Sequence, residues 1–537
     1  MTKQPPFEVC IVGTGAAGGL LAYRLALAGL RVISLEQGDA LPEDYFTHQN
    51  PPGNAKDFGL RPGTRFPINP HEFPFQHELY AGAAERSSSE ESQSNFRQCQ
   101  ILRLNGLLNL WNGISLRLAP ADFQSWPLGY ADLESHYGQV ERLIHVCGTR
   151  ENLPELPDGE FIPPKDLRPA DLLVRQAALK LNGFDLKAIP NRKAMETRAE
   201  KPNRCVSSGG CVAGCPVNSI YKFSTHLWPG IKDLDNYTLS LNSKALRFLG
   251  PDAAGRVQGV EVLDTQTREI RRVQAKAYVL AAGALETPRI LLNSAGESCS
   301  SGLANRSGWV GRGLLDNPKV LLTTSLWKLW GSRACYDPGH GDHLLLLARA
   351  KLREGVTFRC MGQLVHQLPA VPLYLGYLHK FPQRLRPLLA KMLYRSYTTL
   401  AFFAPAAPEP GNRLVLSSHQ DHYGVPQVDV RYQESEQELA MKEAMLALGR
   451  KLLRKSSGTL IFGEAAHPGL GIHYAGTCRM SASPGAGVVD ENLRTFDHSN
   501  LFICDGSVIP ALPEKHLTLT IMALAHRLGE HLSTAVQ

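Results

Sequence analysis

Three cysteines lie close together in the chain, at positions 205, 211 and 215, in a glycine-rich loop that closes with Cys215-Pro216. Thiolates on such a loop can converge on a metal centre, and a terminal Cys-x3-Cys-Pro closes many iron–sulfur loops. Zinc is an alternative, but it prefers four ligands and closer cysteine spacing, and no fourth ligand is obvious. A loop with three free thiols is the remaining interpretation.

A second pattern with chemical potential is the turn Gly13-Thr14-Gly15-Ala16-Ala17-Gly18. Gly13 would make the tight turn, Gly15 would let the backbone approach a pyrophosphate, and Gly18 would let a helix pack closely on a strand. Amides at the start of that helix would hold the phosphates. The pattern is weak alone, so its value depends on the elements around it.

The surrounding elements have the order that a dinucleotide site requires. A β-branched strand, 8–12, precedes the turn, an Ala/Leu-rich helix follows it to Ala28, and a second strand, 31–35, ends at Glu36. An acidic residue at that position can accept the ribose hydroxyls of a dinucleotide, which favours FAD or NAD over NADP.

Composition places limits on the other classes of function. The 537 residues carry a formal charge of +7, too dilute for nucleic-acid binding, and the apolar and charged fractions of 43% and 20% are those of a globular chain. No apolar run approaches the roughly 20 residues of a membrane-spanning helix. The 11 cysteines are too sparse for a disulfide scaffold, and the first residues resemble no export signal, so we expect a cytoplasmic protein.

Four further segments carry a family resemblance: 105–113, 278–288, 473–477 and 505–518. On these segments and the glycine turn, the chain resembles the glucose-methanol-choline (GMC) family of FAD-dependent oxidoreductases from its first strand to its last helix. The match is incomplete at Leu107 and Leu108, which replace small hydroxyl residues of the family's loop. After the turn at Gly283 we expect a helix from Arg289, with Pro288 in its first turn.

The resemblance implies an α/β fold in which a Rossmann-like FAD-binding domain is interleaved with an antiparallel-sheet substrate-binding domain. The FAD domain would comprise 1–120, 203–318 and 469–537, and the substrate domain 121–202 and 319–468. It also implies which residues contact the cofactor: Gly13, Gly15, Gly18, Glu36, Asn105, Gly106, Asn109, Trp111, Asn112, Gly113, Ala282, Gly283, Asp505, Gly506, His516, Leu517 and Thr518.

The family likeness gives two histidines catalytic roles. His473 would be the base that removes a hydroxyl proton, because a neutral imidazole is a competent base near neutral pH. His516 would hydrogen-bond the substrate oxygen while hydride moves to flavin N5. Thr518 would open a terminal helix over 519–532, whose N-terminus stabilises negative charge on the ring. The expected reaction is oxidation of an alcohol, sugar or polyol to a carbonyl.

One branch of this family, the bacterial FAD glucose and fructose dehydrogenases, has a similar cysteine loop that holds a [3Fe-4S] cluster. By resemblance Cys205, Cys211 and Cys215 would be the ligands. A cluster passes single electrons, which suits a dehydrogenase that feeds a cytochrome, a quinone or a small accessory subunit. Relatives in this branch can leave the cytoplasm with a signal-bearing partner. The alternatives are an oxidase that uses dioxygen, or a flavin-binding electron-transfer subunit without turnover.

A basic and apolar stretch lies within 371–403, where no acidic residue occurs. It contains five cations, Lys380, Arg384, Arg386, Lys391 and Arg395. Such a stretch could rest on an anionic membrane or dock a redox partner. The other interpretation is a substrate-domain helix with a solvated basic face.

Overall fold

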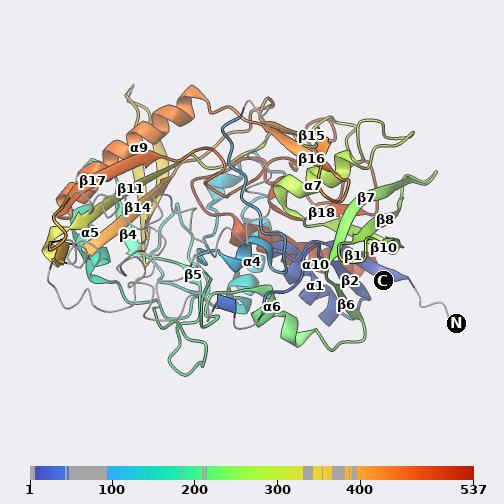
Figure 1. Cartoon of the computed structure of the whole chain (residues 1–537), viewed down its shortest axis with the longest axis horizontal. Helices are drawn as coiled ribbons and strands as arrows, with labels where there is room; N and C mark the ends of the chain where they lie inside the picture. The colour runs from blue at the N-terminus through green and yellow to red at the C-terminus, as the bar shows by residue number, and fades with distance from the viewer. Residues whose placement is uncertain are drawn as a thin grey trace.

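The computed structural model describes residues 6–42, 45–46, 94–181, 183–207, 211, 214–330, 343–353, 355–365, 381–385, 388–389 and 396–536. Two large sheets lie toward opposite ends of its long axis, and both chain termini lie near the same end (Figure 1). No helix in these ranges is both long and apolar enough to cross a membrane.

The first sheet is parallel and has five strands in the order β18-β10-β1-β2-β6. Its strands are short, and β1, β2 and β18 have almost no exposed residue, as expected for a parallel sheet covered on both faces. The strands are β1 (Phe7–Val12), β2 (Val32–Leu35), β6 (Tyr237–Ser240), β10 (Ala275–Leu280) and β18 (Leu501–Ile503). This confirms the predicted α/β fold class with a Rossmann-like sheet, and β1 and β2 lie within a residue of their predicted ends.

Three helices run from the carboxyl edge of this sheet. They are α1 (Ala16–Leu27), α7 (Gly283–Leu292) and α10 (Thr518–Ala535). α10 packs against α1 and also against α4 (Ala131–Leu143). Apolar side chains of α1, α4, α10 and the sheet form one continuous core.

The expected helix start at Arg289 is wrong, because α7 begins at Gly283 and contains Pro288 in its interior. Proline has no N–H, so the carbonyl of Ala284, four residues earlier, loses its helical donor. The hydroxyl of Thr477 replaces it and donates to the Ala284 oxygen at 2.7 Å. The proline is therefore tolerated because a distant segment satisfies the carbonyl that it leaves open.

The second sheet has six strands in the order β17-β11-β14-β13-β12-β4 and all of its pairings are antiparallel. Its strands are β4 (Lys187–Pro190), β11 (Lys319–Leu326), β12 (Leu344–Lys351), β13 (Thr357–Val365), β14 (Tyr397–Phe403) and β17 (Gly458–Ala465). The helices α5 (Pro169–Leu179) and α9 (Glu436–Lys455) lie along it, as Figure 1 shows. A separate apolar core forms between α9, α5 and this sheet.

Smaller sheets complete the fold. β7 (Ser243–Pro251), β8 (Val257–Asp264) and β9 (Ile270–Val273) form a meander beside the parallel sheet, and β15 (Arg413–Gln420) pairs with β16 (Pro426–Arg431). β3 (Val146–Cys147) pairs with β5 (Lys193–Ala194) between the two large sheets. The parallel strands and the antiparallel meander β7–β9 fall in the segments predicted for the FAD domain, and the six-stranded antiparallel sheet falls in those predicted for the substrate domain. The domain boundaries stay a prediction.

A buried ion pair anchors α4 to the core. The Arg117 guanidinium donates to both carboxylate oxygens of Glu141, at 2.8 and 2.6 Å, and both side chains are almost fully buried. The amide of Glu160 donates to the same carboxylate at 2.8 Å. Removing one partner of such a pair leaves an uncompensated charge in the interior.

We therefore predict that Glu141→Leu lowers the free energy of unfolding by about 3 kcal/mol or more. Denaturant titration followed by tryptophan fluorescence measures it. Arg353→Gln is the control, because it breaks the Arg353–Glu443 pair, whose side chains are 91% and 65% exposed, and its midpoint should stay unchanged. Equal stabilities of the two variants would contradict the anchoring role.

Candidate active site

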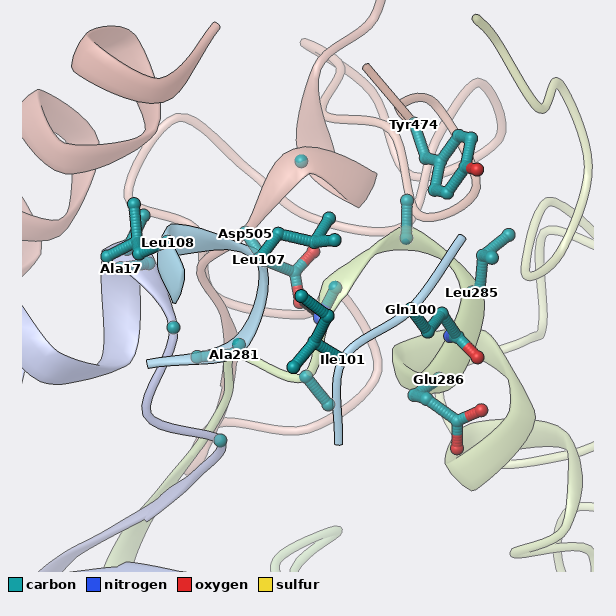
Figure 2. A pocket seen from close by; sticks show the side chains of 18 of the residues that line it. Ala17, Gln100, Ile101, Leu107, Leu108, Ala281, Leu285, Glu286, Tyr474 and Asp505 are labelled. Carbon is teal, nitrogen blue, oxygen red and sulfur yellow. Dashed lines mark hydrogen bonds between the residues drawn. The ribbon is translucent and has the colours of Figure 1, made fainter. Parts of the chain in front are cut away.

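One cavity of ≈ 390 Å³ lies at the carboxyl edge of the parallel sheet and collects most of the predicted cofactor residues. A crevice at this edge is where open α/β sheets bind their ligands. Figure 2 shows its walls: Ala17 at the start of α1, Ala281 after β10, Leu107 and Leu108 on the loop that follows Asn105, and Asp505 after β18. The predicted residues that line it are Gly13, Gly15, Glu36, Asn105, Gly106, Trp111, Asn112, Ala282, Gly283, His473, Asp505, Gly506, His516, Leu517 and Thr518.

Three residues predicted to contact the cofactor, Gly18, Asn109 and Gly113, do not line this cavity. A Cβ on Gly18 would lie 2.0 Å from the Gly13 oxygen, so Gly18 keeps α1 close to the turn, as predicted. The Asn109 amide donates to the Leu104 and Gly106 carbonyls at 2.9 and 3.0 Å and braces the loop. Gly113 has a φ of +81° and its oxygen accepts from the Ala194 amide.

The turn after β1 leaves no room for a side chain. Gly13 has a φ of +98°, and a Cβ there would lie 2.5 Å from the carbonyl oxygen of Ala281. The turn after β10 therefore touches the turn after β1 backbone to backbone, and both turns line the cavity. This geometry explains why a glycine must stand at this point.

The helices α1, α7 and α10 all begin at the cavity without a side-chain cap. Their N-cap residues Gly15, Ala282 and Leu517 make no capping hydrogen bond, and all three line the cavity. By contrast, Ser435 caps α9 with its side chain. Open helix N-termini present amide donors and a partial positive charge, so the cavity suits an anionic ligand.

The carboxylate of Glu36, which directly follows β2, is hydrogen-bonded to the turn that follows β1. It accepts hydrogen bonds from the amide and the hydroxyl of Thr14, at 3.2 and 2.5 Å, and from the Gly38 amide at 3.2 Å. Burial raises its pKa, while these donors lower it. The side chain lines the cavity beside the glycine turn, the position predicted for a ribose-binding acid.

Asp505 links the end of β18 to the start of α7. One carboxylate oxygen accepts from the Gly283 amide at 2.9 Å and from the Thr287 hydroxyl at 2.6 Å. The other accepts from the Ser507 amide at 2.8 Å. Asp505 thereby fixes the position of one of the open helix starts.

These residues fit FAD. The glycine turn and the open helix starts provide donors for a pyrophosphate, and Glu36 provides an acceptor for ribose hydroxyls. The start of α10 would lie where negative charge develops on a reduced flavin ring. The loop with Leu107 and Leu108 begins a short 3-10 helix, Gly106–Asn109, so its polar contribution comes from backbone groups.

The two predicted catalytic histidines contact one another at the cavity. His473 Nε2 lies 3.0 Å from His516 Nδ1, and the two rings meet edge to face. The ring of Phe403, at the end of β14, packs against both. The structure thus brings together two residues that are 43 positions apart in the sequence.

Asn317, which the sequence did not single out, fixes the protonation pattern of this pair. Its Nδ2 donates to the carbonyls of Ala404 and Pro513, so its Oδ1 must be an acceptor. His473 Nδ1 lies 2.7 Å from that oxygen and therefore carries the proton. The lone pair of His473 is then on Nε2, which accepts from His516 Nδ1.

Burial keeps both imidazoles neutral. It lowers the pKa of His473 to about 3, with a smaller effect from the positive charge of Lys319. Burial, followed by the charges of His473, Lys319 and Lys193, lowers the pKa of His516 well below its ordinary value. His516 Nε2 is buried and has no hydrogen-bond partner among the described residues, so a ligand hydroxyl can reach it.

Two further polar groups that no sequence motif pointed to, Lys319 and Gln363, line the cavity. Gln363 accepts from the predicted cofactor residue Asn112 at 3.4 Å, and the half-buried Lys319 donates to the Leu470 carbonyl at 2.9 Å. Asn317, Lys319 and Gln363 lie in or just before the antiparallel strands β11 and β13. Because Asn317 precedes β11 and both strands contain other polar residues, no local pattern marked these three positions.

The three cysteines of the loop belong to one apolar cluster with Cys147, Met195 and Ile220. Each of their sulfur atoms accepts a hydrogen bond: Cys205 from the Ser207 amide, Cys211 from Lys193 Nζ and Cys215 from the Ser219 amide, at 3.4, 3.8 and 3.2 Å. Trp111 packs on this cluster and also lines the cavity. The cysteine cluster therefore lies next to the predicted cofactor site.

Most of the basic stretch within 371–403 lies outside the described residues. Of its five cations only Arg384 is described, and it is exposed. The predicted membrane or partner contact through this stretch stays a prediction.

Comparisons with known proteins agree with this geometry. Residues 173–319 and 408–525 match the N-terminal and C-terminal models of the GMC oxidoreductase family. The fructose dehydrogenase large subunit of Gluconobacter japonicus is 26% identical, and the match covers 97% of each chain. Paromamine 6'-oxidase of Streptomyces fradiae is 29% identical over 97% of this chain and 90% of its own.

A solved structure has the same fold. Pyridoxine 4-oxidase from Mesorbium loti superposes with a TM-score of 0.63 at 18% identity, over 98% of this chain and 99% of its own. With the glycine turn, the open helix starts and the histidine pair on one cavity, these matches place the chain in the GMC oxidoreductase family of FAD-dependent enzymes that act on CH–OH groups.

Proposed function

We propose that the protein is a dehydrogenase that oxidises a sugar or polyol CH–OH group and passes the electrons, through an iron–sulfur cluster, to an external acceptor. The main observation behind this proposal is the neutral His473–His516 pair, which lines the predicted FAD cavity. When bound, FAD supplies the acceptor for the hydride. The name of the relative from Gluconobacter japonicus, a large subunit, supports a partner protein here too.

His473 is the base in this proposal. Asn317 holds its proton on Nδ1, so the lone pair on Nε2 is available for the hydroxyl proton of the substrate. His473 Nε2 now accepts a hydrogen bond from His516 Nδ1–H, and a substrate hydroxyl would take the place of that donor. The Nδ1–H of His516 then donates to the substrate oxygen and holds it in place.

The polar residues beside the pair support a substrate with several hydroxyl groups. Asn112 and Gln363 offer amide donors and acceptors, and Lys319 offers a half-buried cation. A few such groups in an otherwise apolar wall orient a ligand. The hydroxyls of a sugar or polyol can hydrogen-bond with them, whereas the apolar part of a lipophilic alcohol cannot.

The cysteine loop supports the electron-transfer half of the proposal. N–H···S hydrogen bonds stabilise thiolates, and all three sulfur atoms accept one. The [3Fe-4S] centre that the family resemblance implies for Cys205, Cys211 and Cys215 would supply single-electron transfer to an acceptor.

An oxidase that reduces dioxygen is the second candidate. The name of the Streptomyces fradiae relative, an oxidase, favours it. A flavin-binding subunit without turnover is disfavoured by the intact histidine pair. The measurements below separate these possibilities.

We expect sugars or polyols to bleach the flavin absorbance of the FAD-loaded protein under anaerobic conditions, and His473→Ala to slow the bleaching by about 10² to 10⁴, the contribution of a general base. Stopped-flow absorbance with a panel of sugars, polyols and lipophilic alcohols is the measurement. His467→Ala, at an exposed histidine on the same segment, is the control and should bleach normally. No bleaching by any substrate class would argue for the subunit without turnover.

The rate of bleaching should depend little on pH. Because the pKa of His473 lies at about 3, the base stays unprotonated as the pH falls, and the rate constant at saturating substrate should change by no more than about twofold between pH 8 and 5. A histidine with its ordinary pKa of about 6.5 would instead lose about 30-fold over this range. A midpoint near pH 6.5 would show that His473 is not the group whose ionisation controls the step.

The cysteine loop should hold iron. We predict about three irons and matching acid-labile sulfide per chain after anaerobic purification, both lost in Cys205→Ser while FAD is retained. Cys299→Ser, a free cysteine outside the cluster, is the control and should keep the metal. Zinc in place of iron, or no metal at all, would remove the electron-transfer half of the proposal and favour the oxidase.

A further inference from the structure

Three side chains of types that can bind a metal ion converge between α4 and α10. His526 and Glu530 stand four positions apart on α10 and therefore share a face, and His136 faces them from α4. The Nδ1 atoms of His136 and His526 are 2.9 Å apart, and Glu530 Oε1 lies 3.7 Å from His526 Nδ1. The three ligand atoms all lie within 4.8 Å of one another.

We propose that His136, His526 and Glu530 bind a divalent transition-metal ion, with zinc as the best match. Two imidazole nitrogens and one carboxylate oxygen form a common zinc donor set. At zinc–nitrogen distances of about 2.0 Å in a tetrahedral site, two nitrogens lie about 3.4 Å apart, so the rings need to separate by only about 0.5 Å. Both rings would bind the ion through Nδ1, so the ring that now donates its Nδ1–H to the other must carry its proton on Nε2 instead, and no net proton is released.

The three side chains differ in solvent exposure, and the most exposed one leaves a route by which a metal ion can enter. His526 is fully buried, His136 is half-buried, and the Glu530 side chain is 54% exposed. A metal ion can therefore arrive from the Glu530 side, where a water molecule would complete its coordination.

One charged group competes with the metal. Arg24 on α1 lies 3.5 Å from Glu530 Oε1 and is the cation that would have to leave the carboxylate. Its side chain is 35% exposed, so it can turn to solvent. Arg527 is engaged elsewhere, because it donates to the Glu491 carbonyl and to Asn492.

A metal here would clamp α4 to the helix that begins at the FAD cavity. Nearer the cavity, the Tyr137 hydroxyl and the Thr520 hydroxyl already join the same two helices at 2.8 Å. The ion would add a second tie about one and a half turns farther along α10. We expect it to act as a brace for this wall of the cavity and not to take part in the chemistry.

Zinc binding to the FAD-loaded, chelator-treated full chain tests the proposal, by equilibrium dialysis and by thermal unfolding with and without zinc. Glu530→Gln removes a ligand at an exposed position, so the variant should fold. It should bind one zinc fewer per chain, or bind it at least about tenfold more weakly, and its zinc-dependent rise in melting temperature should disappear.

Arg24→Gln is the matched control, because it breaks the same ion pair but keeps all three ligands. It should bind zinc at least as tightly as the wild type, since a competing positive charge is gone. Zinc bound at the cysteine loop or at His473 and His516 is common to all three proteins and cancels in the comparison. Equal zinc binding by wild type and Glu530→Gln, or equal losses in Glu530→Gln and Arg24→Gln, would overturn the proposal.

Discussion

The convergence of three uncapped helix N-termini on one cavity is the constraint from which the rest of the site follows. Each helix start leaves several amides without an intrahelical acceptor, and buried amides without partners are costly. The N-cap residues Gly15, Ala282 and Leu517 offer no side-chain acceptor, although Asp505 accepts from the Gly283 amide at the start of α7. Helix-start amides without acceptors lower the stability of the folded protein, and an anionic cofactor that accepts their hydrogen bonds would raise it. FAD binding is therefore coupled to the stability of this edge of the sheet.

This arrangement requires close backbone approaches that only glycine permits. The turns at Gly13 and Ala281 touch each other, and a Cβ on Gly506 would lie 2.5 Å from the Tyr474 carbonyl. The segment of Gly506 precedes α10, and the segment of Tyr474 carries His473. The same packing that opens the helix starts thus also brings the histidine-bearing segment to the cavity.

The parallel sheet and its glycine turn could be predicted because their signals are local. β1, the turn and β2 follow one another within about 30 residues, and each has a recognisable pattern. The start of α7 was misplaced because its Pro288 is satisfied by Thr477, almost 190 residues away, which no local pattern reveals. Asn317 was missed for the same reason: its importance comes from the carbonyls of Ala404 and Pro513, which fix its orientation.

The neutrality of the histidine pair depends on how the fold balances charge around it. The positive charge of the half-buried Lys319 lowers the pKa of His473, and the negative charge of Asp316 acts on Lys319 in turn. Asp316 accepts the amides of Gly471 and His473 at 2.8 and 2.9 Å, and burial raises its pKa to about 6. Both carboxylate oxygens of Asp316 accept hydrogen bonds from backbone amides of the segment that carries His473. Asp316 therefore positions His473 through its backbone and not through its ring.

The ring of His473 faces the uncharged Asn317 amide on one side and His516 on the other. An aspartate in place of Asn317 would favour the imidazolium, whereas the amide leaves a base that is oriented and still neutral.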